Sequence, residues 1–324
     1  ATHAVLEGKP VDRPPVSVWG HDFLREWSAD DLAAQTIEKQ RAYGYDFVKI
    51  NPRWTLFAEP WGNRYEPPTE QKHPRLIEQV IKQPEDFAGL LDPGAEAPAF
   101  AEHLDAVSQI VAELGDEVDC LATLFSPLAA LGLLAGGVGR PLVGFAGENP
   151  AAAHAALDSI TDTLTAHART LIDAGAAGLF FAPLQWTSLD VCPAGFYAEF
   201  GEPYDRRLLE TVADAPLNLL HVCGDNIGMS RFYDYPVSVL NWDNFGDGNP
   251  GLAEVARASG KVVAGGVPHK RLHKLEQAAL TEVARQALNG VGPQFMLAGG
   301  CAIGALTAEG PRRAVLALAD GLER

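Results

Sequence analysis

Short apolar runs alternate with longer amphipathic segments along almost the whole chain. The runs are rich in β-branched and aromatic residues, and each ends at a polar residue, a glycine or a proline, which is the pattern of buried β-strands. We predict eight strands, over residues 16–19, 46–50, 118–125, 177–182, 217–221, 237–241, 261–264 and 295–298. Because predicted helices separate them, consecutive strands should run parallel in one sheet.

The amphipathic segments carry helix signals. Ser28 or Asp30 can cap a helix that runs to about Tyr43, because short polar side chains accept hydrogen bonds from the free N–H groups of a first turn. We predict further helices over 149–174 and 308–322, and two more between 68 and 114. Eight strand–helix units predict a single (β/α)8 TIM barrel of the α/β class as one catalytic domain over residues 1–324. A doubly wound sheet is the alternative, because strand order is not visible in a sequence.

Composition narrows the function classes. The chain has 47% hydrophobic and 21% charged residues and a formal charge of -17, which argues against nucleic acid as a partner because phosphate binding relies on clustered Lys and Arg. The longest apolar stretch, 128–145, contains five glycines together with Arg140 and Pro141, so we expect no membrane contact. No signal-peptide pattern stands at residue 1, and we expect a cytoplasmic protein. A homodimer is compatible with the sequence.

The candidate chemistry lies just beyond the predicted strands. In TIM barrels, active sites form at the carboxyl ends of the strands, so residues at these positions should meet on one rim. The residues there are His21, Asn51, Ser126, Gln185, Trp186, His221, Cys223, Asp243, His269, Lys270 and Cys301. Of these, His21 and Asp243 suit acid, base or orienting roles, although a structural polar role explains each of them equally well.

Three of these residues form the ligand set of a metal site. Because strand side chains alternate, His221 and Cys223 point to the same side, with Cα atoms roughly 6–7 Å apart. Cys301 follows the last predicted strand. One imidazole and two thiolates with an open fourth position are typical of catalytic zinc. Packed thiols, a nucleophilic cysteine, or a closed structural zinc site with Cys192 as fourth ligand are the alternatives.

Paired glycines give a competing signal. Gly265–Gly266 and Gly299–Gly300 follow the last two predicted strands, where TIM barrels often bind a phosphate. Paired glycines also occur simply where a chain must turn, so this signal is weak.

Several motifs along the whole chain resemble those of the uroporphyrinogen decarboxylase superfamily, which folds as a single TIM barrel. They are the segment Gly8–Val16, the strand entry Gly175–Gly178, Glu202–Tyr204, His221–Gly224 and Gly265–Gly266. True uroporphyrinogen decarboxylases carry a paired-arginine segment after the first strand, an Asp after the second and a Gly-His-Gly turn after the eighth. Residues 19–25, 51–53 and 299–301 lack these hallmarks, so tetrapyrrole decarboxylation is doubtful.

The closer resemblance is to the zinc-dependent methylcobamide:thiol (coenzyme M type) methyltransferases, which bind zinc through His-x-Cys and a later Cys. His221, Cys223 and Cys301 match that pattern. The resemblance implies that a zinc-bound small thiol accepts a methyl group from a methyl-corrinoid such as methylcobalamin. No Asp-x-His-x-x-Gly motif is present, so the corrinoid should belong to a partner protein.

Their positions after the predicted strands suggest roles for five further rim residues. We expect His21 and Asp243 to act as catalytic or orienting groups and Gln185, Trp186 and His269 to contact the cofactor. Three rival functions stay open: a decarboxylase acting on a tetrapyrrole or another acid, a zinc methyltransferase with a folate donor, and a non-catalytic corrinoid- or tetrapyrrole-binding barrel. The folate-dependent enzymes use an additional Glu ligand, for which Glu254 and Glu276 are poorly placed.

Overall fold

A computed structural model describes residues 1–322, and residues 323 and 324 of the expected domain lie outside the described part. Eight parallel strands form one nearly closed barrel, in the order β1-β10-β9-β8-β7-β6-β5-β2. The barrel strands are β1 (Val16–Ser17), β2 (Phe47–Ile50), β5 (Asp119–Phe125), β6 (Gly178–Ala182), β7 (Leu219–Val222), β8 (Val239–Trp242), β9 (Val262–Val267) and β10 (Phe295–Gly299). The prediction of a single (β/α)8 TIM barrel is confirmed.

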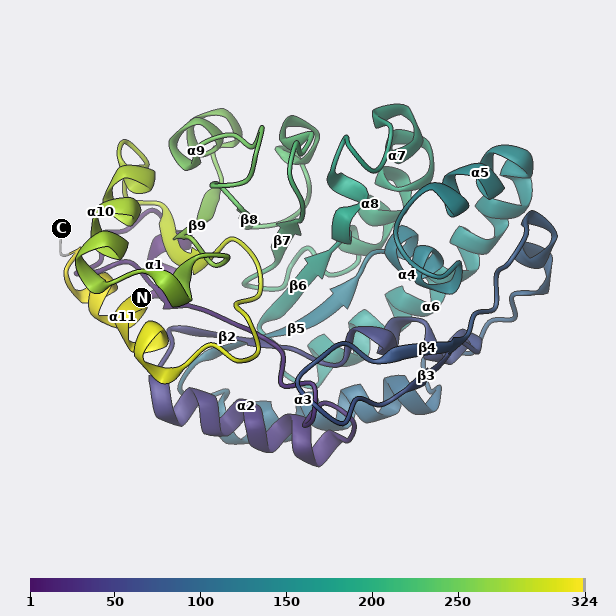
Figure 1. Ribbon diagram of the computed structural model, residues 1–324, viewed down its shortest axis with the longest axis horizontal. Helices are drawn as coiled ribbons and strands as arrows, with labels where there is room; N and C mark the ends of the chain where they lie inside the picture. Colours follow the sequence, from purple (N-terminus) through teal and green to yellow (C-terminus); the bar gives the residue numbers. More distant parts are fainter. Residues whose placement is uncertain (323–324) are drawn as a thin grey trace.

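Helices surround the strands (Figure 1). They are α1 (Thr2–Leu6), α2 (Ala29–Tyr43), α3 (Pro98–Leu114), α4 (Pro127–Leu134), α5 (Arg140–Glu148), α6 (Pro150–Asp173), α7 (Ala194–Phe200), α8 (Glu202–Glu210), α9 (Leu252–Ser259), α10 (Gln277–Leu288) and α11 (Glu309–Asp320). Ser28 is the residue that caps α2, because its side chain accepts a hydrogen bond from the Asp31 amide at 3.1 Å. Within residues 1–322, no helix is long and apolar enough to cross a membrane.

The stretch from β2 to residue 114 contains one α-helix, α3, where two helices were predicted between residues 68 and 114. It contains an antiparallel hairpin, β3 (Arg64–Glu66) paired with β4 (Arg75–Glu78), followed by a short 3₁₀ helix, η3 (Pro84–Gly89). Only α3 forms as an α-helix there. Prolines at 67, 68, 74 and 84 remove backbone donors and disfavour helix in the residues before them. The hairpin projects on the side of the barrel opposite both termini (Figure 1).

The barrel closes where its first two strands meet. Their contact is confined to one end, where the Asp46 amide donates to the Val16 carbonyl at 2.9 Å and the Val16 amide donates to Asp46 Oδ2 at 2.8 Å. Since β1 ends at Ser17, no ladder of backbone hydrogen bonds between β1 and β2 continues beyond this point in the described chain. We call this junction the seam.

Candidate metal centre

The ends of two strands, β7 and β10, bring His221, Cys223 and Cys301 together across the barrel rim. His221 is the third residue of β7, Cys223 follows that strand directly, and Cys301 lies two residues beyond β10. The imidazole nitrogen and the two sulfur atoms all lie within 4.8 Å of one another. A tetrahedral metal with bonds of about 2.0–2.3 Å needs ligand atoms about 3.3–3.8 Å apart, which lies within this limit.

Asn241 on β8 fixes the orientation of His221. Its side-chain nitrogen donates to the carbonyls of Ala264 and Gly299, at 2.9 and 3.0 Å, so its oxygen must face His221 as an acceptor. That oxygen lies 2.7 Å from Nδ1 of His221, which therefore carries the proton. The other ring nitrogen, Nε2, keeps its lone pair free for a metal, as in metal sites where an outer hydrogen bond sets the histidine tautomer.

The pKa values of the two thiols are shifted in opposite directions. The pKa of Cys301 is held well below its usual range, chiefly by a hydrogen bond with Cys223 and also by the nearby His221, although burial opposes this. The pKa of Cys223 is raised well above its usual range by the same hydrogen bond and by burial. Cys301 is therefore the first of the pair to ionise, and a cation at this position would favour loss of the second proton.

A cavity of about 410 Å³ opens beside the two cysteines. Gln185, Asp243 and His269 line it, together with Cys223 and Cys301. The volume falls within the range of small-molecule sites, roughly 300–1,000 Å³. Five of the predicted site residues thus line one cavity. The buried His221 lies next to two of them, Cys223 and Cys301.

Asp243 is a buried residue of the cavity lining, and its carboxylate lies near Lys270, Phe245 and His269. Its carboxylate forms an ion pair with Lys270 at 3.0 Å and accepts the Phe245 amide at 3.2 Å. His269 Nδ1 lies 3.9 Å from Asp243 Oδ1, the oxygen that accepts the Phe245 amide, and has no hydrogen-bond partner among the described residues. Burial lowers the pKa of His269, which therefore favours the neutral imidazole. The pair offers one anchored carboxylate and one free ring nitrogen at the cavity edge.

Three predicted or considered residues lie elsewhere. His21 stacks on Phe23 with ring centroids 4.9 Å apart and lies 2.9 Å from Glu26, and neither it nor Trp186 is among the residues lining the cavity. Trp186 is fully buried in the core against α4 and α7. Cys192 is also buried, with a pKa raised to about 11 by desolvation, and is not part of the ligand cluster.

Two neighbours of the centre were missed from the sequence. The sequence predicts Asn241 only as the last residue of a strand, whereas the strand register places it opposite His221. Lys49 of β2 lies over the ring of Phe180, 4.6 Å from its centroid, and that ring lies 5.3 Å from His221. Burial lowers the pKa of Lys49 to about 8, an effect that the negative charge of Cys301 opposes. A lysine inside an otherwise apolar strand was the available signal.

Comparison with known proteins adds a family and a fold. Residues 1–320 match the family model described as uroporphyrinogen decarboxylase (URO-D), whereas no curated protein matches the chain. A methyltransferase from Methanosarcina mazei is similar with a TM-score of 0.82 and 19% identity, over 98% of this chain and 96% of its own. A B12-independent methionine synthase from Shewanella sp. W3-18-1 is similar with a TM-score of 0.61 and 13% identity, over 97% and 93%.

A further similar structure is a putative vitamin-B12 independent methionine synthase from Listeria monocytogenes. Its TM-score is 0.58 at 14% identity, over 97% of this chain and 98% of its own. At identities this low, the structural likeness establishes the shared barrel fold alone.

Proposed function

This chain belongs to the uroporphyrinogen decarboxylase family, and we propose that within it the protein is a zinc-dependent methyltransferase. It binds Zn²⁺ through Nε2 of His221 and the sulfurs of Cys223 and Cys301. The reaction would transfer the methyl group from the Co(III) of a methyl-corrinoid, carried by a partner protein, to the sulfur of a small thiol. The products would be a thioether, the Co(I) corrinoid and the released thiol proton. The observation that carries the proposal is the three-ligand cluster with its free Nε2, set by the Asn241 hydrogen bond.

The donor chemistry of these residues fits zinc. Two thiolates balance the charge of a divalent ion, and nitrogen–sulfur sets suit zinc far better than magnesium or calcium, which prefer oxygen. Among the described residues, no fourth His, Cys, Asp or Glu joins the cluster. The fourth position would therefore remain available from the cavity side. Zinc, when bound, lowers the pKa of a coordinated substrate thiol and keeps its sulfur nucleophilic at neutral pH.

The surrounding side chains position the reactants. Cys223 and Cys301 line a cavity large enough for a small thiol, and Gln185 and His269 line the same cavity, where we assign them contacts with the corrinoid. Asp243, held by Lys270, orients the polar part of the thiol. Lys49 contributes a positive charge on the barrel side of the centre. His21 contacts Glu26 and Phe23, and we assign it no contact with the reactants. The buried Trp186 packs against α4 and α7 and has a structural role.

The metal assignment is tested by zinc content. We expect about one zinc per chain by mass spectrometry in protein purified without added metal, because three preoriented ligands bind zinc tightly. Cys301→Ser should lose most of this zinc and lower methyl transfer at least a hundredfold. Cys120→Ser is the matched control, since Cys120 is a buried cysteine remote from the cluster and should retain zinc. Unchanged zinc and turnover in Cys301→Ser would contradict the proposal.

The methyl donor is tested separately with the zinc-loaded protein. We expect thiol-dependent demethylation of methylcobalamin, followed by the loss of its spectrum, and no reaction with a methyl-folate. Transfer from methyl-folate alone would instead favour a reaction like that named for the two methionine synthases with the same fold.

A further inference from the structure

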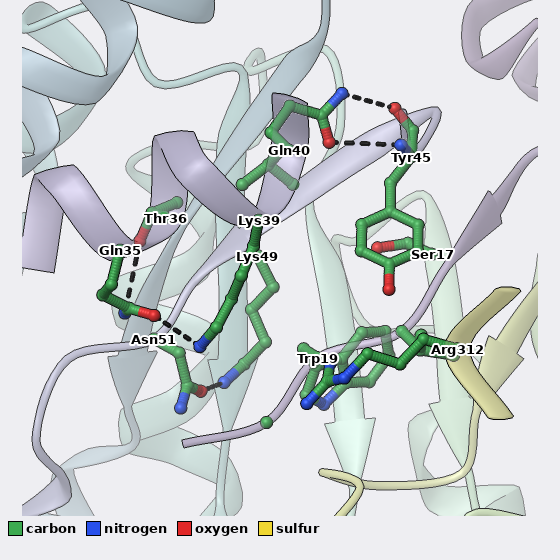
Figure 2. A pocket seen from close by; sticks show the side chains of 13 residues that line it. Ser17, Trp19, Gln35, Thr36, Lys39, Gln40, Tyr45, Lys49, Asn51 and Arg312 are labelled. Atoms are coloured by element: carbon green, nitrogen blue, oxygen red, sulfur yellow. Dashed lines mark hydrogen bonds between the residues drawn. The ribbon is translucent and has the colours of Figure 1, made fainter. Parts of the chain in front are cut away.

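The seam between β1 and β2 contains a second, chemically different site. A cavity of about 40 Å³ lies there, between the two strands and the helices α2 and α11 (Figure 2). It takes its lining from β1, β2, α2 and the first turn of α11, and it is separate from the cavity of the metal centre. A volume of this size exceeds the roughly 30 Å³ that one water molecule occupies in the liquid.

Three basic side chains line this seam cavity and no carboxylate does, among the described residues. The Lys39 amine donates to the side-chain oxygen of Gln35, and the Lys49 amine donates to that of Asn51. Both acceptors are neutral amides. Figure 2 shows these two amines on one side of the cavity and Arg312 on the other. In a chain with a net charge of -17, a pocket whose charged lining residues are all cationic is unexpected.

Arg312 shows the imbalance most clearly. It is 7% exposed, its Nε donates to the Thr307 carbonyl at 3.4 Å, and its guanidinium lies over the Tyr43 ring and within hydrogen-bonding reach of the Tyr45 side chain. Among the described residues, no carboxylate pairs with it. Arg53 is equally buried but lies 2.8 Å from Glu59 and also pairs with Glu102. Burying a charge without a counter-charge is costly, so the protein compensates Arg53 and leaves Arg312 in need of an anion.

Two neutral donors face the same cavity without partners. The side-chain nitrogen of Asn51 and the hydroxyl of Tyr45 are buried and have no hydrogen-bond acceptor within the described residues. Asn51 cannot be turned around to correct this, because its oxygen already accepts from Lys49. Arg312 is near enough to Tyr45 to counteract the rise that burial causes in its pKa, which reaches about 12. Each orphaned buried donor costs about 1–3 kcal/mol until an acceptor is supplied.

We propose that the seam cavity binds a small monovalent inorganic anion, of the size and charge of chloride, between Lys39 and Arg312 with Tyr45 and Asn51 as neutral donors. A metal cation is excluded by the positive lining. Water would satisfy the neutral donors but leaves the charges uncompensated. The anion links α2, β2 and α11 where the strands β1 and β2 have stopped pairing, so it stabilises the closure of the barrel. The seam cavity shares Lys49 with the surroundings of the metal centre but none of its three ligands, so the anion proposal does not depend on zinc binding.

The experiment compares anions on the full-length protein. In chloride or bromide, the melting temperature should exceed that in gluconate at equal ionic strength by about 2–4 °C, with saturation in the millimolar range. A crystal soaked in bromide should give an anomalous peak inside the seam cavity. Arg312→Met should abolish both effects, while Arg207→Met, which removes an exposed arginine outside the cavity, should keep them.

Several outcomes would overturn the proposal. Equal melting temperatures in halide and gluconate would do so, as would a bromide peak without saturable stabilisation, which means binding at crystal concentration only. If Arg312→Met does not fold, Lys39→Met replaces it, with loss of the halide response again expected. Zinc content should be unchanged in either variant, so a failure of this proposal is distinguishable from a failure of the proposed methyltransferase function.

Discussion

The metal centre and the seam belong to the same barrel but treat buried polar groups in opposite ways. At the metal centre the strands pair continuously, and the register of β7 with β8 sets His221 opposite Asn241. The Asn241 side chain has a partner for each of its polar atoms there. At the seam the pairing stops after the first contact, and buried donors remain without acceptors.

The difference shows how two ligand types are selected. At the metal centre, the closed hydrogen-bond network leaves one imidazole lone pair and two thiols without partners in that network, which is the donor set that we propose for a cation. An open network with surplus donors and cationic side chains attracts an anion. Strand pairing decides between these cases, because it determines whether inward-facing polar atoms find partners within the protein.

The largest expected difference is between the stability losses that follow substitution of Arg53 and of Arg312. Arg53→Met should lower the free energy of unfolding by about 3 kcal/mol, because Glu59 and Glu102 lose their counter-charge; we take the low end since both are partly exposed. Arg312→Met should change it by less than about 1 kcal/mol in gluconate, where removal of an uncompensated charge offsets lost packing. Urea denaturation measures both. Equal losses would show that Arg312 has a counter-charge in the protein.

Substitution of Asn241, whose side-chain amide orients His221, tests the metal centre. Asn241→Leu should weaken zinc binding about tenfold to a hundredfold, because His221 loses the acceptor that sets its tautomer. The matched control is Asn218→Leu, which removes another buried amide with two hydrogen bonds near the start of β7. The control should be less stable yet retain its zinc affinity. Competition with a chelator measures the affinity, and equal weakening in both variants would contradict the assignment.

A third region compensates a buried charge with a proton. Asp205 is fully buried, and the Tyr197 hydroxyl donates to its carboxyl group, which also contacts Tyr235. Burial raises the pKa of Asp205 to about 8, well above its value of about 3.9 in an unfolded chain. The folded state therefore holds this proton more tightly, so the associated stability is complete below pH 4 and is lost as the pH rises through 8.

Asp205→Asn should remove this pH dependence. Between pH 6 and pH 8 the wild-type free energy of unfolding should fall by about 2 kcal/mol relative to the variant. Chemical denaturation of both proteins across this range tests the expectation. Parallel pH profiles would show that Asp205 is ionised in the folded protein at pH 6.

The linear sequence determined much of this architecture. Runs of apolar residues located all eight barrel strands within a few residues, and Ser28 marked the start of α2. The two-residue spacing of His221 and Cys223 and the position of Cys301 after the last strand placed all three on one rim. Such features depend on local periodicity and on the general rule that parallel strands end on the same side, so they need no knowledge of particular contacts.

Only the tertiary structure decided which polar residues meet. Strand register paired Asn241 with His221, packing buried Trp186 in the core against α4 and α7, and His21 lies against Glu26 outside the metal centre. The early end of β1 opened the seam and brought Arg312, from the far end of the chain, beside Tyr45. These outcomes depend on register and on contacts between distant segments, which the local pattern of residues does not encode.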